Sequence, residues 1–221
     1  MPDGLTKEEI NRKLLHGLAV ILPVSMFYWP VLLESSRAIF SLILLLLFTI
    51  SLVVEFARLK NNQFSRLFFT LFGSMLRKEE SRQLTGATYV LAGSLFCSLI
   101  SLSSDSAAAA SFLGLTLFIL GDAVAALVGK GIGRIKVGHK TIEGAVGCFL
   151  FCILLTTFVF PELPGFLADW GGDLTGIQII AISASVSILE FFPIKSRSFV
   201  LNDNLYVPAL ASLIALALSE F

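Results

Sequence analysis

One acidic residue lies where an apolar stretch of the sequence meets a basic one. Asp122 is the only acid between Ser106 and Val128, and the residues around it are almost all apolar. An ionisable side chain in such a stretch is costly in free energy and indicates a functional site by default. The alternative is a structural aspartate at a helix end, paired with a neighbouring lysine.

Glycines and basic residues alternate directly after this acid. Glycine amides can approach an anion closely, and basic side chains neutralise its charge. A helix that begins near Thr141 would direct its positive end to the same place. The segment therefore predicts a polyphosphate site, whereas a flexible basic loop would explain the charges but not the glycines. The candidate phosphate-binding residues here are Gly129, Gly131, Gly133, Arg134, Lys136, Lys140 and Thr141.

Two phosphate motifs of soluble folds are excluded for this segment. Residues 133–141 nearly match a Walker A loop, but His139 is an extra residue between Gly138 and Lys140. The segment also follows an apolar helix rather than a strand. Its glycine spacing does not match the dinucleotide-binding fingerprint either.

A basic cluster near the N-terminus opens the first apolar segment. Arg12 and His16 lie one turn apart on a helix, with Lys13 beside them. Arginine binds phosphate through two parallel hydrogen bonds, and histidine can orient a phosphate or transfer a proton. Lys13 alone could anchor the helix at the membrane interface. Together the three predict a functional cluster.

Further oxygen-bearing side chains lie near the ends of apolar segments. Asp203 and Asn204 follow Asn202 at the start of the last one, where they can bind Mg²⁺ or cap a helix. Glu143 lies at another such end and is, with Asp122, a candidate acceptor for a proton. Glu55 and Glu190 complete this set of acids.

The composition identifies the elements that must position these residues as membrane helices. The chain has 221 residues, of which 56% are hydrophobic and only 14% charged, and its mean hydropathy is +0.86. Soluble domains carry about 25% charged residues. The sequence therefore predicts an all-α integral membrane protein with a single domain over 1–221. The zero net charge argues against a nucleic-acid partner.

Seven apolar segments are long enough to predict transmembrane helices. Pro23 and Pro30 are expected to kink the first of them. All Lys and Arg residues except Arg37 fall on one side of the resulting topology, which predicts a cytoplasmic N-terminus. The candidate active site lies on that same cytoplasmic side. The predicted spans are residues 17–33, 38–54, 84–103, 107–128, 144–160, 175–192 and 205–219.

The loop after the second span predicts an amphipathic helix. Apolar residues recur at helical spacing over 64–76, with polar residues off that stripe. Such a helix either lies in the cytoplasmic interface with its apolar face toward lipid, or packs on the protein's own spans.

These motifs together resemble the polyprenol kinase family, which includes dolichol kinase, phytol kinase and the CTP-dependent diacylglycerol kinase. The central pattern runs from Gly121-Asp122 through Gly129 and Gly133 to Lys140-Thr141-x-Glu143-Gly144. The likeness also covers Arg12-Lys13-x-x-His16, the stretch 75–88 and Asp203-Asn204-Leu205, in the same order along nearly the whole chain. Asn202 departs from the pattern, because an acid is expected beside Asp203.

The resemblance implies transfer of the γ-phosphoryl group of a nucleoside triphosphate, usually CTP, to the hydroxyl of a membrane lipid alcohol, with Mg²⁺ as the cofactor. Asp122, Asp203 and Asn204 would bind the metal ion. Arg12 and Lys13 would stabilise charge on the transferred group. No obligate protein partner is indicated, and homo-oligomerisation stays open.

Two other functions compete with this one. A phosphatidate cytidylyltransferase-like enzyme would also use CTP, Mg²⁺ and a lipid, but it would carry an arginine in the segment that here reads Asn202-Asp203-Asn204. A seven-helix transporter would place ionisable residues near the middle of its spans and often contain internal repeats. This sequence places its charges near span ends instead.

Overall fold

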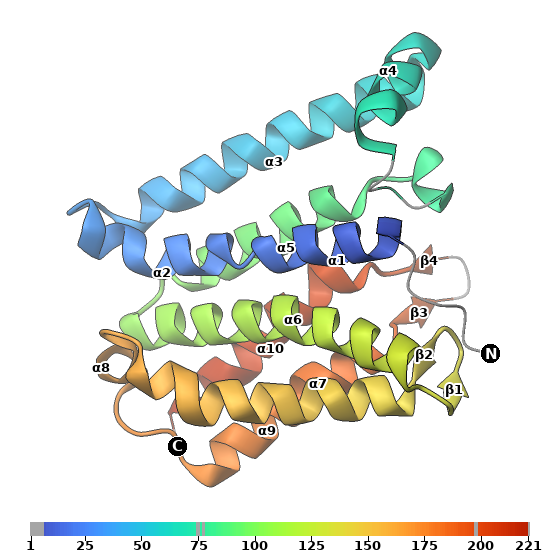
Figure 1. Cartoon of the computed structure of the whole chain (residues 1–221). Coiled ribbons are helices and arrows are strands. Elements are labelled where there is room, and N and C mark those ends of the chain that lie inside the picture. The colour runs from blue at the N-terminus through green and yellow to red at the C-terminus, as the bar shows by residue number, and fades with distance from the viewer. Residues whose placement is uncertain (1–6, 74–75, 77, 197–198, 221) are drawn as a thin grey trace.

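The chain forms a bundle of membrane-type helices in a computed structural model that describes residues 7–73, 76, 78–196 and 199–220 (Figure 1). The α-helices are α1 (Lys7–Leu18), α2 (Ile21–Leu32), α3 (Arg37–Lys60), α4 (Asn62–Phe72), α5 (Gly86–Ile100), α6 (Asp105–Gly131), α7 (Ile142–Leu154), α8 (Phe166–Trp170), α9 (Gly176–Phe191) and α10 (Asp203–Ser219). A π-helical turn (Leu155–Val159) and a 3₁₀ turn (Phe160–Glu162) extend α7, and another 3₁₀ turn (Lys78–Ser81) precedes α5.

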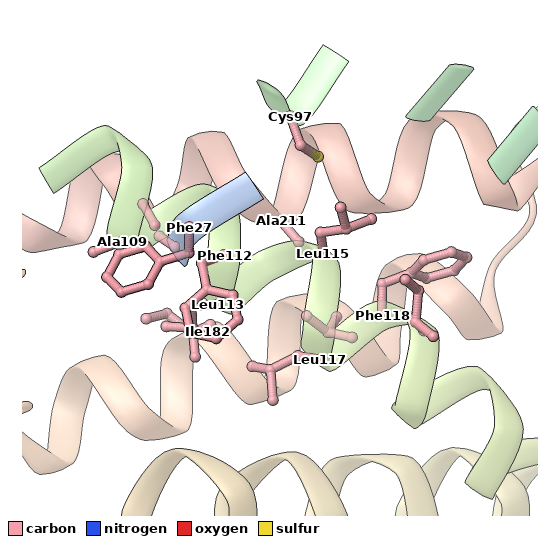
Figure 2. Close-up of a cluster of buried hydrophobic side chains, with 14 of the residues drawn as sticks. Phe27, Cys97, Ala109, Phe112, Leu113, Leu115, Leu117, Phe118, Ile182 and Ala211 are labelled. Carbon is pink, nitrogen blue, oxygen red and sulfur yellow. The ribbon is translucent and has the colours of Figure 1, made fainter. Parts of the chain in front are cut away.

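Helix α6 lies at the centre of the bundle. Residues 107–119 of this helix are all buried, and they pack against α2, α5, α7, α9 and α10. Figure 2 shows Phe112 and Leu113 of α6 among Phe27, Ile182 and Ala211 from its neighbours. A helix that is apolar on every side is stable only when it is surrounded, and small residues let its neighbours approach closely. This central position makes α6 a fixed support for Asp122.

Four helical segments among the described residues are long and apolar enough to cross a membrane: Asn11–Leu32, Arg37–Lys60, Asp105–Gly131 and Ile142–Glu162. Helices α5, α9 and α10 match the other three predicted spans in position but are shorter. The helical character and placement of the predicted segments are thus confirmed, while the count of seven crossings stays a prediction.

The first predicted span is one helical segment, Asn11–Leu32, which is interrupted between α1 and α2. The chain turns at Ala19 and Val20, whose N–H groups donate to His16 and Gly17. Pro23 has no N–H, so it cannot donate to the Ala19 carbonyl, and that carbonyl accepts from Leu22 instead. The interruption therefore lies before Pro23, and Pro30 stays inside α2.

Two β-hairpins lie at the same end of the bundle, which we call the hairpin end (Figure 1). Strands β1 (Lys136–Val137) and β2 (Lys140–Thr141) join α6 to α7, and β3 (Lys195–Ser196) and β4 (Phe199–Val200) join α9 to α10. Both hairpins are closed by the same kind of hydrogen bond, from Ile142 N–H to the Ile135 carbonyl and from Leu201 N–H to the Ile194 carbonyl. Asp122, Lys140, Glu190 and Asp203 therefore belong to two similar helix–hairpin–helix units.

The amphipathic helix predicted over 64–76 is α4, which spans Asn62–Phe72 and also lies at the hairpin end (Figure 1). Asn61 caps it by accepting hydrogen bonds from the N–H groups of Gln63 and Phe64. Leu67 and Leu71 are exposed on its outer face, whereas Phe68 packs inward. Part of this helix thus packs on the protein's own helices, whereas contact of its exposed face with lipid stays a prediction. Met75 of the predicted stripe lies outside the described residues.

Candidate functional site

Asp122 makes its closest polar contacts with α1. Its Oδ2 lies 2.6 Å from Lys13 Nζ and 3.3 Å from His16 Nε2, and its side chain is only 16% exposed. Lys13 also approaches the Asp122 carbonyl at 3.4 Å. Lys13 and His16 of the predicted cluster thus meet the predicted acid, although Lys13 and Asp122 are 109 residues apart in sequence, and Arg12 lines the adjoining cavity. A nearby positive charge such as the Lys13 ammonium group favours the ionised form of a buried carboxylate.

Lys140 joins the two helix–hairpin–helix units. Its Nζ lies 2.7 Å from Glu190 Oε1 and 3.4 Å from Asp203 Oδ2, and it also donates to the Glu190 carbonyl. Burial alone would lower the pKa of Lys140, but the attraction of Glu190 and Asp203 outweighs burial and raises the pKa above its usual value. Asp122 lies within electrostatic range of the same ammonium group. The two ion clusters therefore form one charged site.

A cavity of about 680 Å³ adjoins this site. Its polar wall includes Arg12, Lys13, His16, Asp122 and Asn202–Asn204. Its other wall is largely apolar and comes from α1 to α5 and the segment after α4. The space is therefore amphipathic: one side is charged, and the other is largely hydrocarbon with Ser51, Glu55, Glu80 and Thr85 as its polar members. The apolar lining comprises Leu15, Ala19, Leu22, Val54, Phe68, Phe72, Leu76, Ala87, Val90 and Leu91.

Some of the glycines after Asp122 allow close packing of α6 and α7. Gly129 and Gly131 are the last turn of α6, and Gly133 donates its N–H to the Gly129 carbonyl at 3.1 Å. A Cβ atom on Gly129 would lie 2.6 Å from Thr141 Oγ1, and one on Gly144 would lie 2.6 Å from the Ala125 carbonyl. At Gly129 and Gly144 the missing side chains therefore let α7 approach α6, whereas Gly131 has open space around it, and phosphate binding by this segment stays a prediction.

The other residues of the first hairpin lie outside the cavity. Arg134 and Lys136 are exposed, and Thr141 caps α7 by accepting from Gly144 N–H at 3.1 Å. Both carboxylate oxygens of Glu143 accept from Ile135 N–H at 3.2 Å, which fixes the hairpin to the start of α7. Of the two candidate proton acceptors, only Asp122 lines the cavity.

The start of α10 gives Asn202 a structural role. Asn202 is the N-cap of this helix, and its Oδ1 accepts from Asn204 N–H at 3.0 Å. The Asn204 amide donates to the Gly86 carbonyl at 3.4 Å, and Asp203 reaches Lys140. Capping thus accounts for Asn202, while Asp203 and Asn204 both line the cavity.

A second polar cluster lies across the cavity, and the sequence does not reveal its partners. Arg58 is fully buried, pairs with Glu55, and donates to the carbonyls of Glu80 and Gln83 at 2.7 Å. Glu55 Oε1 accepts from the N–H and the hydroxyl of Thr85. An acid and a base three residues apart at a span end are the sequence signal for this pair, but the loop carbonyls become visible only in the fold. The cluster joins α3 to the start of α5.

The donor set suits a metal ion that is bound largely by substrate. Within the described ranges, no three His, Cys, Asp or Glu side chains converge in the manner of a protein-only metal site. Mg²⁺ usually takes one or two carboxylates together with waters and substrate phosphates. Asp122, Asp203 and Asn204, all beside the cavity and near two lysines, fit that arrangement.

Comparison with known proteins finds relatives that are described only as uncharacterized. No family model and no solved structure matches the chain. The chain is similar to the uncharacterized protein RP860 of Rickettsia prowazekii, with 26% identity over 204 residues, which cover 90% of this chain and 89% of the relative. It is also similar to the uncharacterized protein MJ1137 of Methanocaldococcus jannaschii, with 32% identity over 140 residues, 63% of this chain and 62% of that protein. The function must therefore be argued from the site.

Proposed function

We propose that this protein is a membrane lipid-alcohol kinase of the polyprenol kinase type. It transfers the γ-phosphoryl group of a nucleoside triphosphate, with CTP as the expected donor, to the hydroxyl of a lipid such as a polyprenol, phytol or diacylglycerol. The observation that carries the proposal is the amphipathic cavity, whose polar wall holds Asp122 with Lys13 and adjoins Asp203 with Lys140. Paired carboxylates and lysines beside a hydrocarbon-lined space suit a polyphosphate donor and a lipid acceptor.

Each lysine has two roles in this proposal. Without nucleotide, Lys13 and Lys140 compensate the charges of Asp122 and of Asp203 with Glu190. When a triphosphate binds, the ammonium groups contact its phosphate oxygens, and Asp122, Asp203 and Asn204 would hold the accompanying metal ion. Phosphoryl transfer depends mainly on such positioning and charge neutralisation. Mg²⁺ supplies further neutralisation of the phosphate charge.

The reaction follows from this arrangement. The lipid hydroxyl oxygen attacks the γ-phosphorus, and the bond from that phosphorus to the β,γ-bridging oxygen breaks. The nucleoside diphosphate leaves with the electron pair of that bond. Asp122 accepts the hydroxyl proton, since it alone of the two candidate acids lines the cavity. Arg12 and Lys13 neutralise charge on the transferred group.

The membrane arrangement is part of the proposal. Seven helices cross the bilayer, the N-terminus and the hairpin end are cytoplasmic, and α4 lies in the cytoplasmic interface. Nearly all basic residues then face the cytoplasm, as the positive-inside rule requires. The charged site lies where soluble nucleotides are present.

The test is phosphate transfer by the purified protein. Each γ-labelled triphosphate is offered with a panel of lipid alcohols, and labelled lipid phosphate and nucleoside diphosphate are measured. Asp122→Asn is expected to lose at least about 100-fold in kcat, on the scale of a lost catalytic group. Glu162→Gln, an exposed residue near the opposite end of the bundle, is the matched control and should keep full activity.

The products also separate the proposal from its competitors. A cytidylyltransferase would release pyrophosphate and transfer the cytidylyl group to the lipid. A transporter would move a solute in liposomes without nucleotide. Full kinase activity of a well-folded Asp122→Asn protein would refute the assigned site.

A further inference from the structure

We infer that the apolar half of the cavity is a subsite for one hydrocarbon chain of a lipid, and that this chain enters from the membrane between α1 and α4. The inference rests on the proposed function for the identity of the lipid head group. It goes beyond that function by assigning the wall residues, the entrance and the part of the lipid that is recognised.

The cavity wall is arranged by polarity. Most charged lining residues come from α1, α6 and α10, whereas Val54, Phe68 and Val90 come from α3, α4 and α5. Glu55 on α3 and Glu80 before α5 also line the cavity, but their carboxylates are bound by Arg58 and Thr85 and by the Gly86 N–H. A lipid whose hydroxyl lies at Asp122 would therefore place its chain toward these three helices. The opposite orientation would bury hydrocarbon against charges and leave the carboxylate beside an apolar chain, which is costly.

The entrance is marked by lining residues that are also exposed. Leu15 on α1 is 49% exposed and Phe72 on α4 is 47% exposed, although both line the cavity. Large apolar side chains at an opening indicate contact with hydrocarbon rather than with water. Helix α3 diverges from α1 toward the hairpin end in Figure 1, and α4 continues from its far end. The cavity therefore opens to the side of the bundle.

The size of the cavity limits what is recognised. A volume of about 680 Å³ is that of a pocket that buries a drug-sized ligand. A long polyprenyl chain exceeds it, so only the part nearest the hydroxyl is held and the rest stays in the bilayer. We expect an isoprenoid alcohol of four units and one of eleven units to differ in KM by less than about threefold, because the added units contact only lipid in both states.

Cysteine protection tests the subsite without any need for turnover. The native cysteines Cys97, Cys148 and Cys152 are fully buried, so they should give little background labelling. Leu15→Cys and Phe72→Cys are alkylated with a membrane-permeable maleimide in bilayer nanodiscs, with and without the four-unit alcohol. The matched controls are Leu14→Cys and Leu67→Cys, on the same two helices but outside the cavity lining.

The alcohol is expected to slow labelling of Leu15→Cys and Phe72→Cys at least about fivefold and to leave both controls unchanged. Equal effects on all four positions would overturn the inference, since they would report only partition into the bilayer. As a second variant, Leu15→Trp should raise the KM for the lipid but not for the nucleotide, and Leu14→Trp should raise neither. Protection without phosphate transfer would retain the subsite and refute the kinase function. Phosphate transfer without protection would retain the kinase function and refute the subsite.

Discussion

At the scale of single residues, the site consists of carboxylates that are each held by a lysine from another element. Asp122 on α6 meets Lys13 on α1, and Glu190 on α9 meets Lys140 on the first hairpin. A buried charge without a partner would cost several kcal/mol, so each pair is a condition for keeping these acids ionised in an apolar bundle. The same pairs place cations where a polyphosphate would need them.

The pH dependence of stability is a first prediction at this scale. The pKa of Lys140 is raised by Glu190 and Asp203 despite its burial, and Asp122 also acts on it. A lysine with a raised folded-state pKa contributes stability that is present below the unfolded pKa of about 10.4 and is lost as pH rises through the folded value. The difference in melting temperature between the wild type and Lys140→Met should therefore be constant from about pH 7 to 9 and shrink only above about pH 10.4.

Thermal unfolding in detergent across this pH range measures that difference. Lys136→Met, at an exposed position of the same hairpin, provides the control and should follow the wild type throughout. A difference that shrinks already below pH 9 would contradict the assigned ion cluster.

At the scale of elements, the glycines around the first hairpin determine how closely two helices approach. A Cβ atom on Gly133 would lie 2.1 Å from the Gly129 carbonyl and 2.8 Å from the Thr141 side chain. Position 131 has no atom within 4 Å of such a Cβ. Close packing therefore requires a glycine at position 133 but leaves room for a side chain at position 131.

Gly133→Ala is accordingly expected to lower the free energy of unfolding by about 1–3 kcal/mol, since overpacking forces backbone shifts. Gly131→Ala is the matched control and should be close to neutral. Denaturant or thermal unfolding in detergent compares the two variants. Equal stability of both would show that Gly133 is not required for packing of α6 on α7.

A buried arginine on α3 packs against helix α4. Arg58 lies over the rings of Phe68 and Phe69 at 5.3 and 5.7 Å and also bonds Glu55 and two loop carbonyls. Lysine keeps the charge but cannot form the planar fork or stack in the same way.

Arg58→Lys should therefore loosen α4 while leaving the central helices intact. Hydrogen exchange over 62–72 is expected to speed up at least about tenfold, with little change over 107–119, because local opening costs less than global unfolding. Arg66→Lys, at an exposed position of α4, is the control. Uniformly faster exchange along the chain would instead indicate a general loss of stability.

At the scale of the whole molecule, seven crossings would place the two ends of the bundle on opposite sides of the membrane. Gly138 lies in the first hairpin and Glu162 lies beyond the far end of α7, and both are exposed. Cysteines at these two positions should be labelled by an impermeant maleimide from opposite sides of sealed vesicles. Glu34→Cys should behave like Glu162→Cys, since both lie on the side that holds few basic residues. Labelling of all three from one side would refute the topology.

The sequence by itself determined the class of the protein and the position of its helices. Long apolar runs with few charges leave helices as the only way to satisfy backbone polar groups in lipid, so these runs predict α2, α3, α5, α6, α7, α9 and α10 from local information. The same reasoning singled out Asp122, because an acid within such a run is rare.

Only the tertiary structure decided which partner each of these residues has. Lys13 and Asp122 are 109 residues apart, and Lys140 and Glu190 are 50 apart, so their pairing depends on how α1, α6 and α9 pack. Sequence spacing also does not show that α7 lies against some of the glycines after Asp122. Contacts between helices depend on side-chain packing across the whole bundle, and this long-range information is absent from any local pattern.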